Sequence, residues 1–307
     1  MAKVVLILGN GFDIDLGLKS KYIDFIKEEE WRNLCDSVIN KFPEKFQIVS
    51  LLKHIQNAGN TPSLWFDVEN EIHNFILNYP KRENEIPENL KELHRSELTT
   101  LRKALYLYLQ RITKEFKFKE EKWSYRLIKS LTESNNKVKV FTFNYTNTCE
   151  LCKLPPIDFT YIHGNLEDNN IVVGCEPVWR EYIPMSFRFL LKSNMVSNPN
   201  NIIENLWTAN EVIFFGHSLN VFDYSYFKEF FDYICSPIDH ELNLTFITKN
   251  QKSEEEIRIN LFEQGIDVRN LFKSNIKTTF IHTEQNEYEV LKDQDSFNFL
   301  LERIKGT

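Results

Sequence analysis

Long apolar runs, glycine and an excess of basic residues are all missing from this sequence. No apolar stretch approaches the roughly 20 residues that a membrane-spanning helix needs. Glycine supplies only 9 of 307 residues, which excludes collagen-like and glycine-rich low-complexity chains. Acidic residues number 44 against 37 basic ones, and this net charge of −7 argues against a protein whose whole surface binds nucleic acid. We therefore expect a globular protein that makes no contact with a membrane.

Secretion signals and paired cysteines are also missing. The apolar run Val4–Leu8 is too short for the core of a signal peptide, and no small-residue cleavage site follows it. Five cysteines are an odd number, which favours reduced thiols over a disulfide framework. We expect a cytoplasmic protein.

One C-x-x-C motif, Cys149 to Cys152, stands alone. A tetrahedral zinc site needs four ligands, and no second C-x-x-C supplies the other two. A metal or redox role therefore stays open beside the simpler interpretation that these are small residues packed next to a helix. We expect no bound metal.

The residues that the sequence does contain are typical of an α/β protein. Apolar residues make up 42% of the chain, which is ample for a packed core. The first stretch, LILGNGFD, is an apolar run that stops abruptly at Gly-Asn-Gly and is followed by Asp13. A buried strand that ends in Gly-x-Gly and leads into a helix is how an open α/β sheet offers backbone N–H groups to a phosphate.

Strand-like and helical patterns alternate along the rest of the chain. Helical spacing of apolar residues covers most of the chain between the first and second strands, and this segment is too long for a simple crossover. The predicted fold is a Rossmann-like, doubly wound parallel sheet with a large helical insertion after the first strand-helix unit. The predicted strands after the first are Val138–Phe143, Phe159–Ile162, Ile171–Val173, Val212–Phe215, Leu242–Thr248 and Thr278–Ile281, and the predicted helices between the first two are Tyr22–Asn40, Leu64–Tyr79, Asn89–Phe116 and Trp123–Ser134.

The organisation that we predict is one domain over residues 1–307, with the helical insertion or subdomain at 31–135. Proline, charged and amide residues gather at Pro80–Pro87, which is the expected exposed linker within the insertion. No internal repeat is visible.

Four stretches follow strand-like runs and carry polar residues: LGNGFDIDLGL, FTFNYTNTCE, YIHGNLED and FFGHSLNVFDYSYF. The carboxyl ends of parallel strands meet at one edge of the sheet, where open α/β folds bind ligands. We therefore expect the four stretches to line one pocket. A lone Gly-x-Gly is weak evidence, and the third glycine of the dinucleotide fingerprint is replaced by Ile14.

In chain order, these stretches resemble the motifs of known families. The NAD-binding motifs of the sirtuin-like superfamily have the same order as Gly9-Asn10-Gly11 with Gly17-Leu18, Phe143-Asn144-Tyr145, His163-Gly164 and Gly216-His217-Ser218-Leu219. The chain more closely resembles the AbiH family, bacterial proteins associated with phage defence. The motifs that carry this resemblance are NGFDIDLGL, Trp65-x-Asp67-x-Glu69, FNYTNT, YIHG and GHSLNVFDYSYF. This resemblance spans about residues 4 to 231.

The resemblance implies an NAD-type ligand and two catalytic residues. Asn144 takes the place of an asparagine that serves the nicotinamide ribose, and His163 takes the place of the catalytic histidine. A neutral amide can hold a ribose hydroxyl or a water, and an imidazole with a pKa of about 6.5 suits a general base. The residues expected to contact the nucleotide are Gly9, Asn10, Gly11, Phe12, Asp13, Tyr145, Gly216, His217, Ser218 and Asp223.

Each of these residues also has a structural interpretation. Asn144 also suits a turn in which it bonds its own backbone, and His163 also suits a hydrogen bond with a carbonyl in the core. A carboxylate at Asp13 would repel a pyrophosphate, so Asp13 must cap a helix, bond a ribose hydroxyl or share a cation. Asp223 is predicted on the apolar face of the following helix, where it either caps the helix or accepts from a ribose or adenine, and Ser218 or Asn220 is expected to cap that helix.

Two acids of the insertion differ in their expected surroundings. Glu69 shares a helix face with Ile72 and Ile76 and is predicted to be buried or turned to a site, whereas Asp67 is expected to be the more solvated of the two. A buried acid needs a partner or a function. Glu69 and His73 have the spacing of a metal-binding pair, although such pairs are more often surface contacts.

The function that we predict is a phage-defence effector that binds NAD and, when triggered, hydrolyses it to nicotinamide and ADP-ribose. The sirtuin deacetylases' four-cysteine zinc module is absent, so protein deacylation is not implied. The expected partners are NAD or a related nucleotide and an unidentified phage-derived trigger or protein, and the insertion is a place for a sensor or a homo-oligomer contact. Two alternatives stay open: a non-hydrolytic module that binds ADP-ribose or NAD, and a metal-dependent nuclease with Mg²⁺ on Asp13, Asp15 and Glu69.

Overall fold

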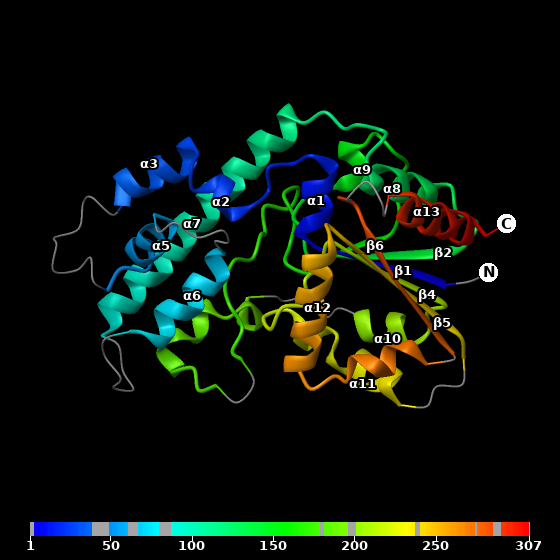
Figure 1. Cartoon of the computed structure of the whole chain (residues 1–307). Coiled ribbons are helices and arrows are strands. Elements are labelled where there is room, and N and C mark those ends of the chain that lie inside the picture. The colour runs from blue at the N-terminus through cyan, green and yellow to red at the C-terminus, as the bar shows by residue number, and fades with distance from the viewer. Residues whose placement is uncertain are drawn as a thin grey trace. The chain divides into compact units, whose positions relative to one another are not determined.

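The chain folds into two compact units, whose elements are labelled in Figure 1. The computed structural model describes residues 3–38, 49–60, 67–79, 87–178, 181–195, 201–236, 240–273, 275–284 and 290–306. Unit 1 comprises Met1–Leu18, Phe116–Ile162 and Pro199–Thr307, and unit 2 comprises Lys19–Glu115 and His163–Asn198. None of the described helices combines the length and the hydropathy needed to cross a bilayer.

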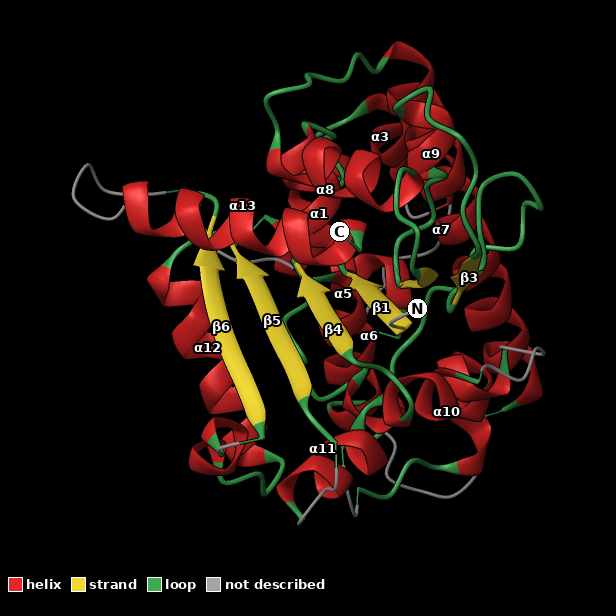
Figure 2. Ribbon diagram, turned by 90° about the vertical axis from the view of Figure 1, so that its right-hand side faces the viewer, coloured by secondary structure: helices red, strands yellow, loops and turns green. Residues whose placement is uncertain are grey.

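The centre of unit 1 is a six-stranded sheet in which all neighbouring strands are parallel. Figure 2 shows β1, β4, β5 and β6 side by side with the same direction. The strand order is β3-β2-β1-β4-β5-β6, the order of a Rossmann-like fold, so the predicted fold class is confirmed. The strands are β1 (Lys3–Leu8), β2 (Lys137–Thr142), β3 (Phe159–Tyr161), β4 (Glu211–Phe215), β5 (Leu242–Thr248) and β6 (Ile276–His282).

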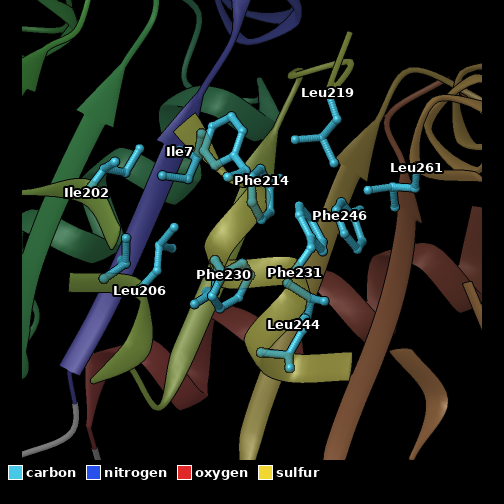
Figure 3. Close-up of a cluster of buried hydrophobic side chains, with 14 of the residues drawn as sticks. Ile7, Ile202, Leu206, Phe214, Leu219, Phe230, Phe231, Leu244, Phe246 and Leu261 are labelled. Carbon is cyan, nitrogen blue, oxygen red and sulfur yellow. The ribbon is translucent and has the colours of Figure 1, made fainter. Parts of the chain in front are cut away.

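Both faces of this sheet are covered, because its central strands are apolar on both sides. Alternate residues of β1 enter two different cores: Val5 and Ile7 lie in one, and Val4, Leu6 and Leu8 in the other. Figure 3 shows the first core, which α10, α11 and α12 cover. The second core lies under α1, α8 and α13.

The helices of unit 1 follow the strands in the alternation of a doubly wound fold. They are α1 (Asn10–Leu16), α8 (Trp123–Thr132), α9 (Thr148–Leu151), α10 (Ile202–Trp207), η4 (Tyr224–Tyr226), α11 (Lys228–Cys235), α12 (Gln251–Glu263), η5 (Val268–Phe272) and α13 (Val290–Lys305), where η marks a 3-10 helix.

In its described residues, unit 2 consists of helices and of an irregular segment at 163–178 and 181–184, and the long helix α7 contacts several of its other helices. Contacts join α7 to α3, α5 and η2, and α5 to α6. Ser50 caps α5 and also donates to the buried carboxylate of Glu97 on α7, which ties these two helices together. The helices are α2 (Tyr22–Phe25), α3 (Glu29–Val38), α5 (Leu51–Gly59), α6 (Val68–Leu77), α7 (Glu88–Glu115), η2 (Met185–Leu190) and η3 (Lys192–Asn194).

The described helical segments differ from the predicted insertion at 31–135. Unit 2 begins at residue 19 and has a second segment, 163–198, that the sequence analysis did not associate with the insertion. The helix α8 lies inside the predicted range but belongs to unit 1, because Leu127 and Ile128 pack in the core of the sheet.

Two predicted elements are wrong in detail. Ile171–Val173 is not a strand: its residues are buried, but among the described residues around it the pairing found is an isolated bridge between Cys175 and Leu191. A short apolar run reports burial and not strand pairing, which explains the error. The predicted helix over 22–40 is two helices, α2 and α3, whose Phe25 and Trp31 rings pack 5.6 Å apart and so keep a common apolar face. Residues 39 and 40, Trp65 and most of the predicted linker at 80–87 lie outside the described residues.

Candidate functional site

The glycines after β1 allow that strand's end to approach β4. Leu8 pairs with Thr142 on one side and Phe215 on the other, so the segments that follow the three strands begin level with one another. The N–H of Gly9 donates to Phe215 O at 3.0 Å, and the N–H of Gly11 donates to Gly216 O at 2.9 Å. These two amides are therefore committed to the neighbouring strand end rather than to a ligand.

The loops after β1 and β4 approach each other so closely that these positions leave no room for a side chain. A Cβ on Gly9 would lie 2.5 Å from Gly216 O, and one on Gly11 would lie 2.6 Å from Gly216 Cα. Gly216 itself has φ +63°, and its Cβ would meet Phe12 N at 2.3 Å. Glycine at all three positions lets the loops after β1 and β4 touch.

Asn144 connects the segment after β2 to the same place. It is 5% exposed, and its side-chain amide donates to Gly9 O at 3.0 Å. Its own N–H donates to Thr142 Oγ1 at 3.1 Å. Asn144 therefore has a structural role, since its amide nitrogen fixes the segment after β2 against the loop after β1.

Asp13 is buried on α1, with 2% of its surface exposed. Its Oδ2 accepts a hydrogen bond from Thr146 Oγ1 at 2.8 Å. Burial raises the pKa of Asp13 to about 7, against the lowering effects of hydrogen bonds from Thr146 and Asn144. The carboxyl group thus joins α1 to the segment after β2, a role that the sequence did not reveal.

A histidine and an aspartate face each other after β4. The Nδ1 atom of His217 accepts from Leu219 N–H at 3.0 Å, so its Nε2 carries the proton of the neutral ring. That Nε2 lies 4.0 Å from Asp223 Oδ2. The rings of Phe143 and Phe227 pack edge-on against the imidazole, with centroids 4.5 and 5.1 Å away. His217 and Asp223 form a polar pair at the margin of an aromatic core.

Asp223 was predicted on the apolar face of a helix, and this prediction is wrong. It precedes η4, and α11 begins only at Lys228. Asn220 Oδ1 accepts from the N–H groups of Phe222 and Asp223, each at 3.1 Å, so the expected cap at Asn220 is found on a turn. The helix therefore begins later than the sequence predicts, because this turn and η4 come first.

The other predicted contact residues of unit 1 differ in exposure. Asn10 and Ser218 are exposed, Tyr145 is half-buried and Phe12 is buried in the core of the sheet. The structure therefore brings the first, second and fourth motif stretches together within unit 1, around Gly9, Asn144 and Gly216.

The third stretch enters unit 2 at His163, which directly follows Ile162 in the chain. His163 is 3% exposed, and Gly164 after it has φ +78°, a backbone conformation that favours glycine. The Nζ atom of Lys192 lies 3.4 Å from His163 Nε2. The prediction that His163 shares a pocket with Asn144 stays a prediction.

Glu69 is buried, as predicted, and contacts this histidine through the same lysine. It is 7% exposed on α6, and its Oε2 lies 2.6 Å from Lys192 Nζ. Asp67 caps α6 by accepting from the Glu69 N–H at 2.9 Å, and it is half-buried and so more exposed than Glu69, as predicted. Sequence reasoning missed Lys192, because a single lysine beside serine and asparagine has the pattern of a surface residue.

The carboxylates of the nuclease alternative have separate partners. Asp15 Oδ2 accepts from Ser124 N–H at 2.8 Å and so caps α8, while Asp13 bonds Thr146 and Glu69 pairs with Lys192. In the part of the chain that the structure describes, no group of three or more His, Cys, Asp or Glu residues is arranged to hold a metal ion.

Glu69 and His73, suggested by their spacing as a metal-binding pair, also contact different partners. His73 Nε2 lies 2.5 Å from Glu181 Oε2, while Glu69 faces Lys192. Of the two cysteines in the C-x-x-C motif, Cys149 lies in α9 and Cys152 caps its end, and both are buried in the core of the sheet. Burial raises the pKa of both thiols, that of Cys152 to about 12, which fits the packing interpretation.

Comparison with known proteins identifies the family. The model of the family described as "Bacteriophage abortive infection AbiH" matches residues 5–247. The chain belongs to the AbiH family. Membership implies a role in bacteriophage abortive infection. No curated protein and no solved structure matches the chain.

The match covers the AbiH motifs in both units. It begins on β1 and ends on β5, so it includes all four motif stretches, α6 with Glu69 and the segment that carries Lys192. The resemblance to AbiH proteins is therefore confirmed, while the relation to the sirtuin-like superfamily stays a prediction.

Proposed function

We propose that this AbiH protein binds NAD at the carboxyl ends of β1, β2 and β4 and, once triggered, hydrolyses it to nicotinamide and ADP-ribose. The observation that carries the proposal is the strand order. In a sheet with this order, dinucleotides bind where the order reverses, between β1 and β4, and the predicted nucleotide-contacting loops of unit 1 meet at that point.

The polar groups at this edge suit a ribose better than a phosphate. The N–H groups of Gly9 and Gly11 are bonded to the neighbouring strand end, whereas Asn144 has an amide oxygen besides the nitrogen that donates to Gly9 O, and Asp223 has a carboxylate whose side chain is 12% exposed. A carboxylate accepts hydrogen bonds from hydroxyls, and the Nε2 atom of His217 lies 4.0 Å from this one. We assign Asn144 and Asp223 to ribose hydroxyls.

The proposed reaction replaces nicotinamide by water at C1′ of the ribose. The leaving group is already cationic, so it takes the electron pair of the C1′–N bond without needing an acid. Water supplies the new C1′–O bond, and its proton goes to the assigned base, His163. Asn144 orients the ribose or the water.

One observation favours the alternative of a module that binds NAD or ADP-ribose without hydrolysing it. The Nε2 atom of His163 faces the Lys192 ammonium at 3.4 Å, and a base needs a lone pair to take a proton. A measurement of nicotinamide release distinguishes NAD hydrolysis from binding without hydrolysis.

The test measures nicotinamide release and NAD affinity of the purified protein, with and without lysate from phage-infected cells. We expect His163→Ala to lower the triggered rate by about 10²–10⁴-fold with little change in NAD affinity. The matched control is His54→Ala, a half-exposed histidine of unit 2 paired with Glu71, which should keep the parent rate. Tight binding without release in any sample would favour the binding module, and a His163→Ala protein as fast as the parent would overturn the assigned base.

A further inference from the structure

Lys192 is a buried cation inside unit 2. Only 1% of its surface is exposed, and it is among the largest fully buried side chains of the described residues. Removing an ammonium from water costs several kcal/mol, so a lysine is buried only with a partner or a task. Its Nζ lies 2.6 Å from Glu69 Oε2 and 3.4 Å from His163 Nε2.

The hydrogen-bonding capacity of lysine decides what this contact does to His163. An ammonium has three N–H donors and no acceptor, so at Nε2 it can only donate. The lone pair of Nε2 is then occupied, and a neutral imidazole carries its proton on Nδ1. In this state His163 has no lone pair left for a proton from water.

Backbone hydrogen bonds position the contact between Lys192 and His163. The N–H of Val172 donates to His163 O at 2.8 Å, and the N–H of Lys192 donates to Cys175 O at 2.9 Å. The N–H of Cys175 donates to Leu190 O at 3.0 Å. One short segment, 172–175, therefore holds the histidine at one end and the lysine at the other.

Glycine makes the approach of these segments possible. A Cβ on Gly174 would lie 2.5 Å from Leu190 O, so any larger residue would push the lysine-bearing segment away. On the other side, Glu69 is fixed to the ammonium from α6, and its Oε1 lies 3.4 Å from the Tyr22 hydroxyl.

We propose that Lys192, held by Glu69, is a latch that keeps His163 from acting as a base until the ammonium is drawn away. Lys192 is a positioning residue in this scheme, because it acts through His163. The latch rests on the proposed function, since it takes His163 as the base. A defence enzyme that consumes NAD must be silent before infection, and the latch supplies that silence within unit 2.

The first readout does not depend on NAD. In ¹⁵N-histidine NMR, with His163→Ala used to assign the signals, the wild-type ring should show a protonated Nδ1 and a hydrogen-bonded Nε2. Lys192→Met should abolish this preference, and Lys192→Arg, which keeps a cationic donor, should restore most of it. The matched control is Glu97→Gln, a buried carboxylate of unit 2 that is bonded to Ser50, Leu51 and His94, and it should leave the His163 signals unchanged.

The second readout is nicotinamide release by protein that has not met a phage lysate. Lys192→Met should release nicotinamide at least about 10-fold faster than the wild type, as part of the 10²–10⁴-fold that a general base contributes. Glu69→Gln, which weakens the hold on the ammonium with little change of shape, should do so to a smaller extent and serves if Lys192→Met does not fold.

Unchanged His163 signals in Lys192→Met would overturn the latch. So would an unchanged basal rate in a protein whose wild type responds to infected lysate. If neither the wild type nor any variant releases nicotinamide, with or without lysate, the proposed function fails. The NMR comparison alone then decides whether the Lys192 ammonium is bonded to the Nε2 atom of His163.

Discussion

The side-chain amide of Asn144 donates to the backbone carbonyl of Gly9 at 3.0 Å, although 135 residues separate the two in sequence. The bond joins the segment after β2 to the loop after β1, beside the point where the strand order reverses. A residue assigned to a ribose thus also holds the edge of the sheet together.

Removing this amide should weaken both stability and ligand binding. Asn144→Ala removes one of two donors to Gly9 O, which still accepts from the Phe12 N–H at 2.9 Å, and we expect this loss to lower the free energy of unfolding by about 0.5–1.5 kcal/mol. Asn144→Asp should be worse at pH 8, because it adds a carboxylate that cannot donate beside the buried Asp13. Guanidinium unfolding measures both, and an Asn144→Ala protein as stable as the parent would contradict the role of the bond.

The buried carboxyl of Asp13 should make stability fall as the pH rises. Its pKa is about 7 in the folded protein, and that of an unfolded aspartate is about 3.9. Between these values the folded state keeps a proton that the unfolded state has lost, so the contribution of Asp13 to stability falls by up to about 1.4 kcal/mol per pH unit. Asp13→Asn should therefore gain stability over the parent as the pH rises from 4 to 7, and above pH 7 the gain should stay constant.

Thr146→Val provides the matched comparison for this titration. It removes a hydrogen bond that lowers the pKa of Asp13, so the pKa should rise further and the loss of stability should extend to higher pH. Unfolding midpoints between pH 4 and 9 measure both variants. Parallel pH profiles for the parent and Asp13→Asn would exclude a buried, titrating Asp13.

The contact between the loops after β1 and β4 should not tolerate a methyl group. The Cβ of Gly11→Ala would lie 2.6 Å from Gly216 Cα, so we expect a loss of about 1–3 kcal/mol or more from overpacking. Gly265→Ala is the control, since no atom lies within 4 Å of its Cβ and only its φ of +84° causes strain. If Gly11→Ala melts at or above the temperature of Gly265→Ala, the close approach is not a constraint.

An ion pair between a buried carboxylate and a partly exposed arginine, at the other end of β4, should be costly to break. Arg303 Nε and Nη2 donate to Glu211 at 2.5 and 2.7 Å, and Glu211 is 4% exposed. Burial raises the pKa of Glu211, while the Arg303 guanidinium lowers it. Arg303→Met should therefore raise that pKa further and cost about 3–5 kcal/mol at neutral pH, with a smaller loss in acid.

Two further variants complete this experiment. The double variant Glu211→Gln with Arg303→Met should recover much of the lost stability, because no buried charge remains. Arg269→Met breaks an exposed ion pair with Asp267 and should change stability little. Equal losses for the buried and exposed pairs in urea unfolding would show that burial of Glu211 does not matter.

The sequence by itself determined the parallel sheet and the edge at which its polar loops gather. Runs such as Val4–Leu8 are apolar at every position, which indicates a strand buried on both faces. Parallel strands end at one edge, so Gly9, Asn144 and Gly216 could be placed together before their contacts were known.

The tertiary structure alone decided which partner each buried polar group has. Periodicity indicates that Glu69 is buried and that Ile171–Val173 is apolar, but it does not name Lys192 as the partner or the bridge at Cys175 as the local pairing. Asp13 and Thr146 lie 133 residues apart in sequence, and only the packing of α1 against the segment after β2 brings them within 2.8 Å. A pattern reports how deeply a residue is buried, whereas a hydrogen bond depends on where two distant segments meet in space.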